Sequence, residues 1–230
     1  MRKHQAGFTL IEIAIVLVII GLLLGGVLKG QELITSARVR NLISQQDGVK
    51  AAYFGFLDRF RSLPGDYGLA TTNIAGVTVN GNANGQIQSI ALGGATTLIE
   101  EHIAVWEHLS RAGFVNGSYT YAAAEGPASV PTNPYVRYIQ VMYDNAYGPD
   151  PAPVPPPAVR HNIKTGNQIP SDILAEIDRK VDDGNPVGGV FQFSVYNGGA
   201  GGTAPGGAAC LSGGAWTAPS IANCGGASLL

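Results

Sequence analysis

The feature that most constrains this chain is an apolar run near its start. Residues 8–28 contain no Lys, Arg, Asp or Pro. As an α-helix that rises ~1.5 Å per residue they would span roughly 31 Å, about the thickness of a hydrocarbon core. The run is therefore long enough to cross a membrane.

One acidic residue, Glu12, lies inside this run. An ionised carboxylate in a membrane helix costs about 2.5–3.5 kcal/mol on insertion scales, and more when it has no partner. Two interpretations follow from the residues alone. Glu12 is a functional group, or it lies close enough to the helix end for its carboxylate to reach the lipid headgroups.

The length and composition allow one long helix and one domain of ordinary size. The chain has 230 residues, of which only 13% are charged and 32 are glycine. This balance is unusual for a soluble enzyme and is typical of a loop-rich protein outside the cytoplasm. The net charge of −2 provides no basic surface for specific nucleic-acid binding.

The apolar run continues into a second helical pattern over residues 29–63. Apolar side chains recur there at spacings of three, four and seven, the periodicity of an amphipathic helix. They are Leu42, Val49, Tyr53, Phe56, Leu57, Phe60 and Leu63. No proline precedes Pro64-Gly65, which is a helix stop. The sequence therefore predicts one helix of about 55 residues.

Residues 64–230 predict a head of short helices and strands. One helix is expected within 96–113, with Gly113 ending it, and another within 169–186, with Ser171 or Asp172 as its cap and Asp183-Gly184 as its end. Strands are expected at 117–124, 135–144 and 188–197, the last of these being the final strand. The fold class is α+β, with a small, mainly antiparallel sheet.

Two segments of the head are predicted to lack regular structure. Residues 148–160 are rich in proline and should form an extended surface loop. Residues 198–230 are rich in glycine and have little to pack. This tail contains the only cysteines, Cys210 and Cys224, which in an oxidising compartment would close a loop worth roughly 3 kcal/mol. Two isolated buried thiols are the alternative.

The stretch Gly7-Phe8-Thr9-Leu10-Ile11-Glu12 follows a short basic leader and begins the apolar helix. It resembles the amino-terminal signature of type IV pilins and of the pseudopilins of type II secretion. The resemblance implies that residues 1–7 are a leader, that a prepilin peptidase cuts between Gly7 and Phe8, and that Phe8 is then N-methylated. It covers about the first 35 residues.

The resemblance also implies a role for Glu12 and a place for the protein. Cleavage would create an amine at Phe8, about one helical turn before Glu12. In the family the Glu pairs with the amine of a neighbouring subunit and sets the register of the filament, and the sequence does not distinguish this from pairing within its own chain. Residues 8–28 would span the bacterial inner membrane before assembly and form the filament core afterwards. Expected partners are copies of this chain or other pilins, the peptidase and the inner-membrane assembly platform, and the filament is periplasmic or extracellular.

The chain departs from the family in one respect. Many pilins carry a proline near the end of the apolar run, whereas residues 22–30 of this chain contain none. The glycines 21, 25, 26 and 30 form two small-xxx-small pairs that would permit close helix approach, although such glycines are common in membrane helices.

Candidate metal ligands are few. His102, Glu107 and His108 lack the spacing of a zinc site, since the histidines are six residues apart, and we expect them to be exposed helix residues. Asp182, Asp183 and Asn185 surround a glycine turn and offer oxygen ligands for calcium. The resemblance supports this hypothesis, since some pseudopilins bind calcium in their heads. Because the spacing of a calcium loop is absent, helix termination is the alternative role.

Two further features have structural and functional interpretations. Asp66 should hold the turn after the long helix through backbone amides, with a ligand set shared with Asn73 as the alternative. The aromatic residues of 135–144 are expected to pack in the sheet, with a binding face as the alternative.

No catalytic motif stands out, so we expect a protein that is not an enzyme and that needs no cofactor, calcium apart. The predicted function is that of a structural subunit of a type IV pilus or a pseudopilus. The alternative is a single-span, membrane-anchored adhesin or binding module that never polymerises. The sequence does not distinguish motility, adhesion, DNA uptake and secretion, or a major from a minor subunit.

Leader removal can be tested directly by mass spectrometry of the mature protein. We expect an amino terminus at Phe8 that carries one added methyl group. An intact Met1 terminus in cells with an active prepilin peptidase would contradict the resemblance.

Overall fold

The structure is a computed structural model that describes residues 9–91, 98–149, 156–199 and 201–230. The chain divides into two compact units, residues 1–38 and 39–230. A single helix, α1 (Leu10–Phe60, 51 residues), begins in the first unit and ends in the second. Every described side chain from Thr9 to Lys29 is exposed in this chain.

The second part of α1 is the amphipathic helix that the periodicity predicts. Its buried residues are separated mostly by three or four positions. They are Val39, Leu42, Gln46, Val49, Ala52, Tyr53 and Phe56. The helix ends at Phe60, three residues before the predicted end, because Arg61 adopts a left-handed conformation with φ of 53°. Leu63 precedes a proline and is disfavoured in a helix as well.

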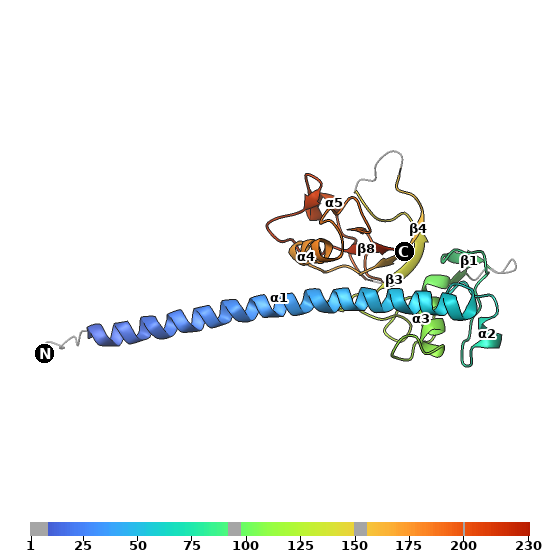
Figure 1. Ribbon diagram of the computed structural model, residues 1–230, viewed down its shortest axis with the longest axis horizontal. Coiled ribbons are helices and arrows are strands. Elements are labelled where there is room, and N and C mark those ends of the chain that lie inside the picture. The colour runs from blue at the N-terminus through green and yellow to red at the C-terminus, as the bar shows by residue number, and fades with distance from the viewer. Residues whose placement is uncertain (1–8, 92–97, 150–155, 200) are drawn as a thin grey trace. The chain divides into compact units, whose positions relative to one another are not determined.

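A four-stranded antiparallel sheet packs on this part of α1. Its strands are β3 (Gln140–Asp144), β4 (Arg160–Lys164), β5 (Phe191–Phe193) and β8 (Gly226–Leu229), in the order β3-β4-β8-β5. Val141 pairs with Ile163, and Ile163 pairs with Ser228. Figure 1 shows the sheet and α4 (Ser171–Val181) on one side of residues 39–60 of α1. The predicted α+β class is confirmed.

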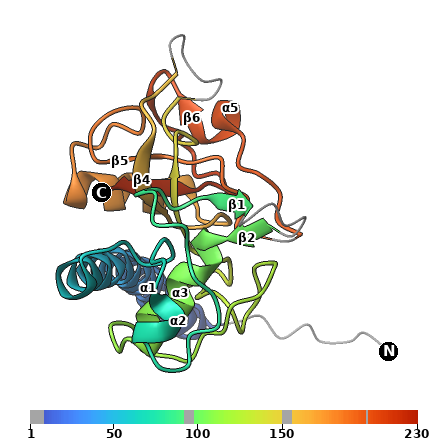
Figure 2. The ribbon, with the colours of Figure 1, turned by 90° about the vertical axis from the view of Figure 1, so that its right-hand side faces the viewer.

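The remaining elements are short. Figure 2 shows α3 (Glu101–Arg111) beside α1. The other helices are α2 (Ala70–Asn73) and α5 (Gly207–Cys210), and two small hairpins pair β1 (Ser89–Ala91) with β2 (Leu98–Glu100) and β6 (Leu211–Ser212) with β7 (Ala215–Trp216).

The core of the head consists of two hydrophobic clusters, and α1 contributes to both. Val49, Tyr53 and Phe56 pack with α3, β3 and β4. Val39 and Leu42 pack with α4, β5 and the cysteines. The helix is therefore part of the core over most of the length of the head, which the periodicity of residues 29–63 had indicated.

The expectation that residues 198–230 have little to pack is wrong. Residues 226–229 form β8, which lies between β4 and β5 in the sheet and is the last strand in place of residues 188–197. The sequence Gly-Ala-Ser-Leu has weak strand propensity, so only its pairing on both sides reveals it. Gly226 is required there because an added Cβ would lie 2.4 Å from Cζ of Phe191.

Several predicted boundaries also change. Residues 117–124 form no strand, and β3 occupies only the second half of 135–144. The predicted helix at 96–113 begins as strand β2, and helix α3 starts at Glu101; Gly113 follows its end with φ of 82°. Residues 150–155 of the proline-rich loop lie outside the described residues, and β4 begins at its last position, Arg160.

Gly226→Ala should lower the free energy of unfolding of the head by about 1–3 kcal/mol, since the methyl group overpacks the ring of Phe191. The control is Gly206→Ala, where an added Cβ has its nearest neighbour at 4.0 Å; a change within about 0.5 kcal/mol is expected there. Urea unfolding of the full chain in detergent measures both. Equal effects of the two substitutions would contradict the central position of β8.

Candidate functional site

The start of α1 is closed by a reciprocal pair of side chains, Thr9 and Glu12. The backbone N–H of Thr9 donates to Oε2 of Glu12 at 2.8 Å, and the Thr9 hydroxyl donates to the same oxygen at 2.7 Å. In return, the backbone N–H of Glu12 donates to the Thr9 hydroxyl oxygen at 3.3 Å. This is a capping box, with Thr9 as N-cap and Glu12 three residues later.

The capping box supplies a partner for Glu12 that the sequence interpretation did not consider. The carboxylate is held within its own chain by Thr9, and it also lies in the first turn, where the helix dipole favours negative charge. Thr-x-x-Glu before an apolar run is a sequence signal for this motif, so Thr9 could have been identified from the sequence.

The same carboxylate keeps acceptor capacity. All three bonds of the box use Oε2 or the Thr9 hydroxyl, and no residue in the described ranges donates to Oε1. The exposed side chains of Ile13, Ile15 and Val16 lie beside it on the same helix. Gly7 and Phe8, the predicted cleavage and methylation positions, lie outside the described residues.

α1 is the one helix among the described residues that is long and apolar enough to cross a membrane. It runs without a break through residues 22–30, where the family's proline is absent. A Cβ added at Gly21, Gly25, Gly26 or Gly30 would meet no atom of this chain within 4 Å. Their role in close helix approach stays a prediction.

The prediction that His102, Glu107 and His108 are exposed is wrong. Residues 101–109 of α3 are buried without exception, and Glu101, Glu107 and His108 bind loop backbone. Nδ1 of His108 accepts from the N–H of Gly65 at 2.9 Å, and its Nε2 lies 3.0 Å from the carbonyl oxygen of Val79. Burial lowers the pKa of His108, so it stays neutral at pH 7.

Two carboxylates of α3 hold the loops that cover it. Glu107 accepts from the N–H groups of Thr78 and Tyr121 at 2.9 and 3.2 Å. Glu101 accepts from the N–H groups of Asn82 and Gln88 at 3.0 and 3.1 Å. These side chains therefore satisfy backbone donors in segments that have no strand or helix of their own.

Asp66 has the same kind of role. Its carboxylate accepts from the N–H groups of Asn84 and Gly85 at 3.0 and 2.8 Å, so it clamps a distant loop rather than its own turn. Asn73 donates instead to the hydroxyl of Tyr67. The structure does not bring Asp66 and Asn73 together as hydrogen-bonding partners.

The acidic turn after α4 brings three carboxylates together. Oxygens of Asp178, Asp182 and Asp183 lie within 4.8 Å of one another, and Asn185, also predicted as a ligand, points its Oδ1 at the N–H of Val187 at 3.2 Å. Calcium prefers such oxygen ligands. The calcium hypothesis stays a prediction.

Backbone and indole donors already use several of these oxygens. Asp182 accepts from the N–H of Phe191 at 3.0 Å and from that of Val190. Asp178 accepts from the N–H of Gly184 at 3.2 Å and from Nε1 of Trp216 at 2.8 Å. The cluster thus shapes the turn that ends α4, in line with the alternative role. No side chain caps α4 at its start, contrary to the prediction for Ser171 or Asp172.

The cysteines form the predicted disulfide, Cys210–Cys224, with a Cα–Cα distance of 5.7 Å. It lies in the cluster with Val39, Leu42 and α4. The disulfide therefore closes a loop within the glycine-rich region and is itself buried in the core.

A charged cavity of about 470 Å³ that the sequence interpretation missed lies beside the start of α3. Glu100 and Glu125 flank His102, whose ring nitrogens lie 3.3 and 3.6 Å from their carboxylate oxygens. Burial lowers the pKa of His102 and raises the pKa of Glu125. Glu125 lies in a different segment from Glu100 and His102, so no local pattern connects all three.

Comparison with known proteins identifies the amino-terminal segment. The prokaryotic N-terminal methylation motif matches residues 2–28, which include Thr9 and Glu12. No curated protein and no solved structure matches the chain. The match therefore identifies only the start of the chain, and statements about the head rest on its structure alone.

The ionisation of Glu101 should be visible in the pH dependence of stability. Burial raises the pKa of Glu101 from 4.5 to about 7, so the folded state binds this proton more tightly than the unfolded state. The resulting stabilisation of the folded state is fully present below pH 4.5 and is lost as the pH rises through 7. Glu101→Gln cannot ionise, so relative to wild type it should gain stability between pH 5 and pH 8.

Urea unfolding of both proteins at several pH values measures this difference. The amide loses one of the two backbone hydrogen bonds at every pH, so only the pH-dependent part reports ionisation. A difference that stays constant between pH 5 and pH 8 would contradict the assignment.

Proposed function

We propose that this chain, which carries the N-terminal signature of type IV pilins and pseudopilins, is a filament subunit that polymerises through its N-terminal helix. The filament would be a type IV pilus or a pseudopilus of the type II secretion kind. The observation that carries the proposal is the methylation motif at residues 2–28, placed at the start of an unbroken apolar helix.

The exposed apolar part of α1 supports polymerisation. The described side chains from Leu10 to Leu28 are all exposed, and no described residue covers them. Such a surface requires lipid or protein around it. The bilayer would cover it while the subunit is stored in the inner membrane, and neighbouring helices would cover it in a periplasmic or extracellular filament.

Processing by a prepilin peptidase would supply the positively charged partner that Glu12 lacks. Cleavage between Gly7 and Phe8 would leave a cationic amine at Phe8. We propose that the amine of a neighbouring subunit binds Glu12, whose Oε1 has acceptor capacity while Oε2 caps the helix. The capping box would then hold the carboxylate in one orientation before the neighbour arrives.

Glu12→Gln separates the cap from the charge, since glutamine also completes a capping box but cannot form the ion pair. We expect Glu12→Gln and Glu12→Ala to insert in the membrane normally and to lower filament yield by about tenfold, the effect of losing about 1.4 kcal/mol per contact. Sheared filaments and membrane fractions measure the two quantities.

Thr9→Val is the matched control, because it removes the hydroxyl of the cap and keeps the Glu12 charge. We expect a smaller loss of filaments than for Glu12→Gln. Normal assembly of Glu12→Gln together with poor assembly of Thr9→Val would show that Glu12 acts as a helix cap and not through an amine. Normal membrane anchoring of processed protein with no filament at any expression level would favour the anchored adhesin.

A further inference from the structure

A groove beside the second part of α1 has a lining without charge. Its volume is about 440 Å³, within the range of small-molecule sites. The polar residues that line it are Asn41, Ser44, Gln45, Asn116 and Tyr119, and among its described lining residues none is ionised at neutral pH. The contrast with the cavity of Glu100, His102 and Glu125 is clear, since that one is lined by carboxylates.

Two polar atoms at this groove are buried without a partner. Nε1 of Trp106, a fully buried residue, donates to no acceptor in the described part of the chain. Oε1 of Gln45 accepts no hydrogen bond there, although its Nε2 donates to the carbonyl of Thr132 at 2.9 Å. A buried donor and acceptor left unpaired are costly. Neither atom has accessible surface, so pairing with a bound molecule would require their side chains to rotate toward the groove, and it would then be favourable.

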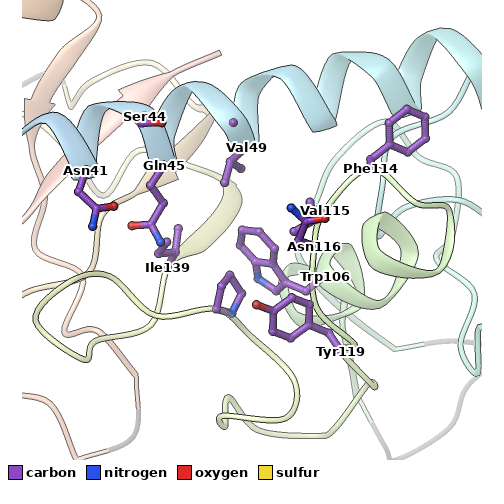
Figure 3. Close-up of a pocket in the computed structure, with 12 residues that line it drawn as sticks. Asn41, Ser44, Gln45, Val49, Trp106, Phe114, Val115, Asn116, Tyr119 and Ile139 are labelled. Atoms are coloured by element: carbon purple, nitrogen blue, oxygen red, sulfur yellow. The ribbon is translucent and has the colours of Figure 1, made fainter.

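The walls combine aromatic faces with amides. Figure 3 shows Asn41, Gln45 and Val49 projecting from α1 on the side where Ile139, Trp106 and Tyr119 lie. The rings of Trp106 and Tyr119 are 6.5 Å apart at 61°. Amides and hydroxyls donate and accept hydrogen bonds, and aromatic faces contact apolar ring surfaces.

Gly48 opens the groove on the helix side. It lies in the interior of α1, where glycine weakens a helix relative to alanine. A Cβ added at Gly48 would meet nothing within 4 Å, so no contact within this chain requires a glycine there. The absence of a side chain there leaves room for a molecule in the groove.

We propose that this groove binds a neutral, hydroxyl-rich ring, which is the chemistry of a carbohydrate. The uncharged lining disfavours phosphates, carboxylates and amines, which bury charge without a counter-ion. The unpaired indole N–H would donate to one hydroxyl of such a ring, and the unpaired amide oxygen would accept from another. The size suits a sugar unit and is too small for a protein segment with its own secondary structure.

The test uses the full chain in a detergent without a sugar headgroup, so that the detergent does not compete. The probes are glucose, galactose and N-acetylglucosamine, with glucuronate and glucosamine as charged counterparts. Saturation-transfer NMR detects contact and calorimetry measures affinity. We expect at least one neutral sugar to bind, and its charged counterpart to bind about tenfold more weakly or not at all.

Gly48→Leu locates the site. Leucine favours helix more than glycine does, so the variant should fold, and its side chain should fill the groove and weaken sugar binding by about tenfold or more. Ala51→Leu, on the same helix at an exposed position that does not line the groove, is the control and should bind like wild type. Trp106→Phe, which keeps a ring and removes the N–H, should weaken binding about tenfold.

Three results would overturn the proposal. One is the absence of binding by all neutral sugars, and another is tighter binding of glucuronate or glucosamine. The third is unchanged sugar binding by Gly48→Leu. If no sugar binds and Gly48→Leu lowers filament yield while Ala51→Leu does not, the groove is occupied by a neighbouring subunit and not by a sugar. Binding is measured on the unassembled chain, so failure to polymerise would not affect the result.

Discussion

The buried stripe of α1 is the constraint on which the head depends. The head has two hydrophobic clusters, and Val39 and Leu42 enter one while Val49, Tyr53 and Phe56 enter the other. The sheet is small, and its central strands are only four and five residues long. A sheet of this size needs a helix against it to bury enough apolar surface for stability.

A second constraint comes from the long irregular segments of the head. Residues 74–88 contain no helix or strand, and yet their backbone N–H groups need partners. Buried carboxylates provide several of them: Glu107 and Glu101 reach the loop from α3, and Asp66 reaches it from the turn that follows α1. In the sequence the residues of α3 resemble exposed helix positions and Asp66 resembles a turn residue, and the loops they hold are what bury them.

The amino terminus and the head offer different kinds of candidate site. At the start of α1, one carboxylate oxygen caps the helix while the other retains acceptor capacity, so in the proposed filament capping and recognition of a neighbouring amine would share a single side chain. In the head, an uncharged groove and a carboxylate-lined cavity lie on different sets of residues. The methylation motif says nothing of either, because it ends at residue 28.

What could be read from the sequence is what depends on neighbours along the chain. The apolar run, the periodic stripe up to Phe56, the Thr9–Glu12 spacing and the closeness of Cys210 and Cys224 are local patterns, and helices express such patterns directly. The sequence interpretation did not include Thr9 as the N-cap, although Thr-x-x-Glu before an apolar run indicates a capping box. The disulfide was predictable because only one pairing of two cysteines exists.

Tertiary structure decided the rest. β8 is a strand because β4 and β5 pair on both sides of it, and its own residues barely favour that conformation. The burial of His102, Glu107 and His108 depends on loops that are distant in sequence, and the groove depends on three segments that meet beside α1. Propensity and periodicity report only a residue's near neighbours, so the sequence determined the helix and its start, while contacts across the chain determined the head.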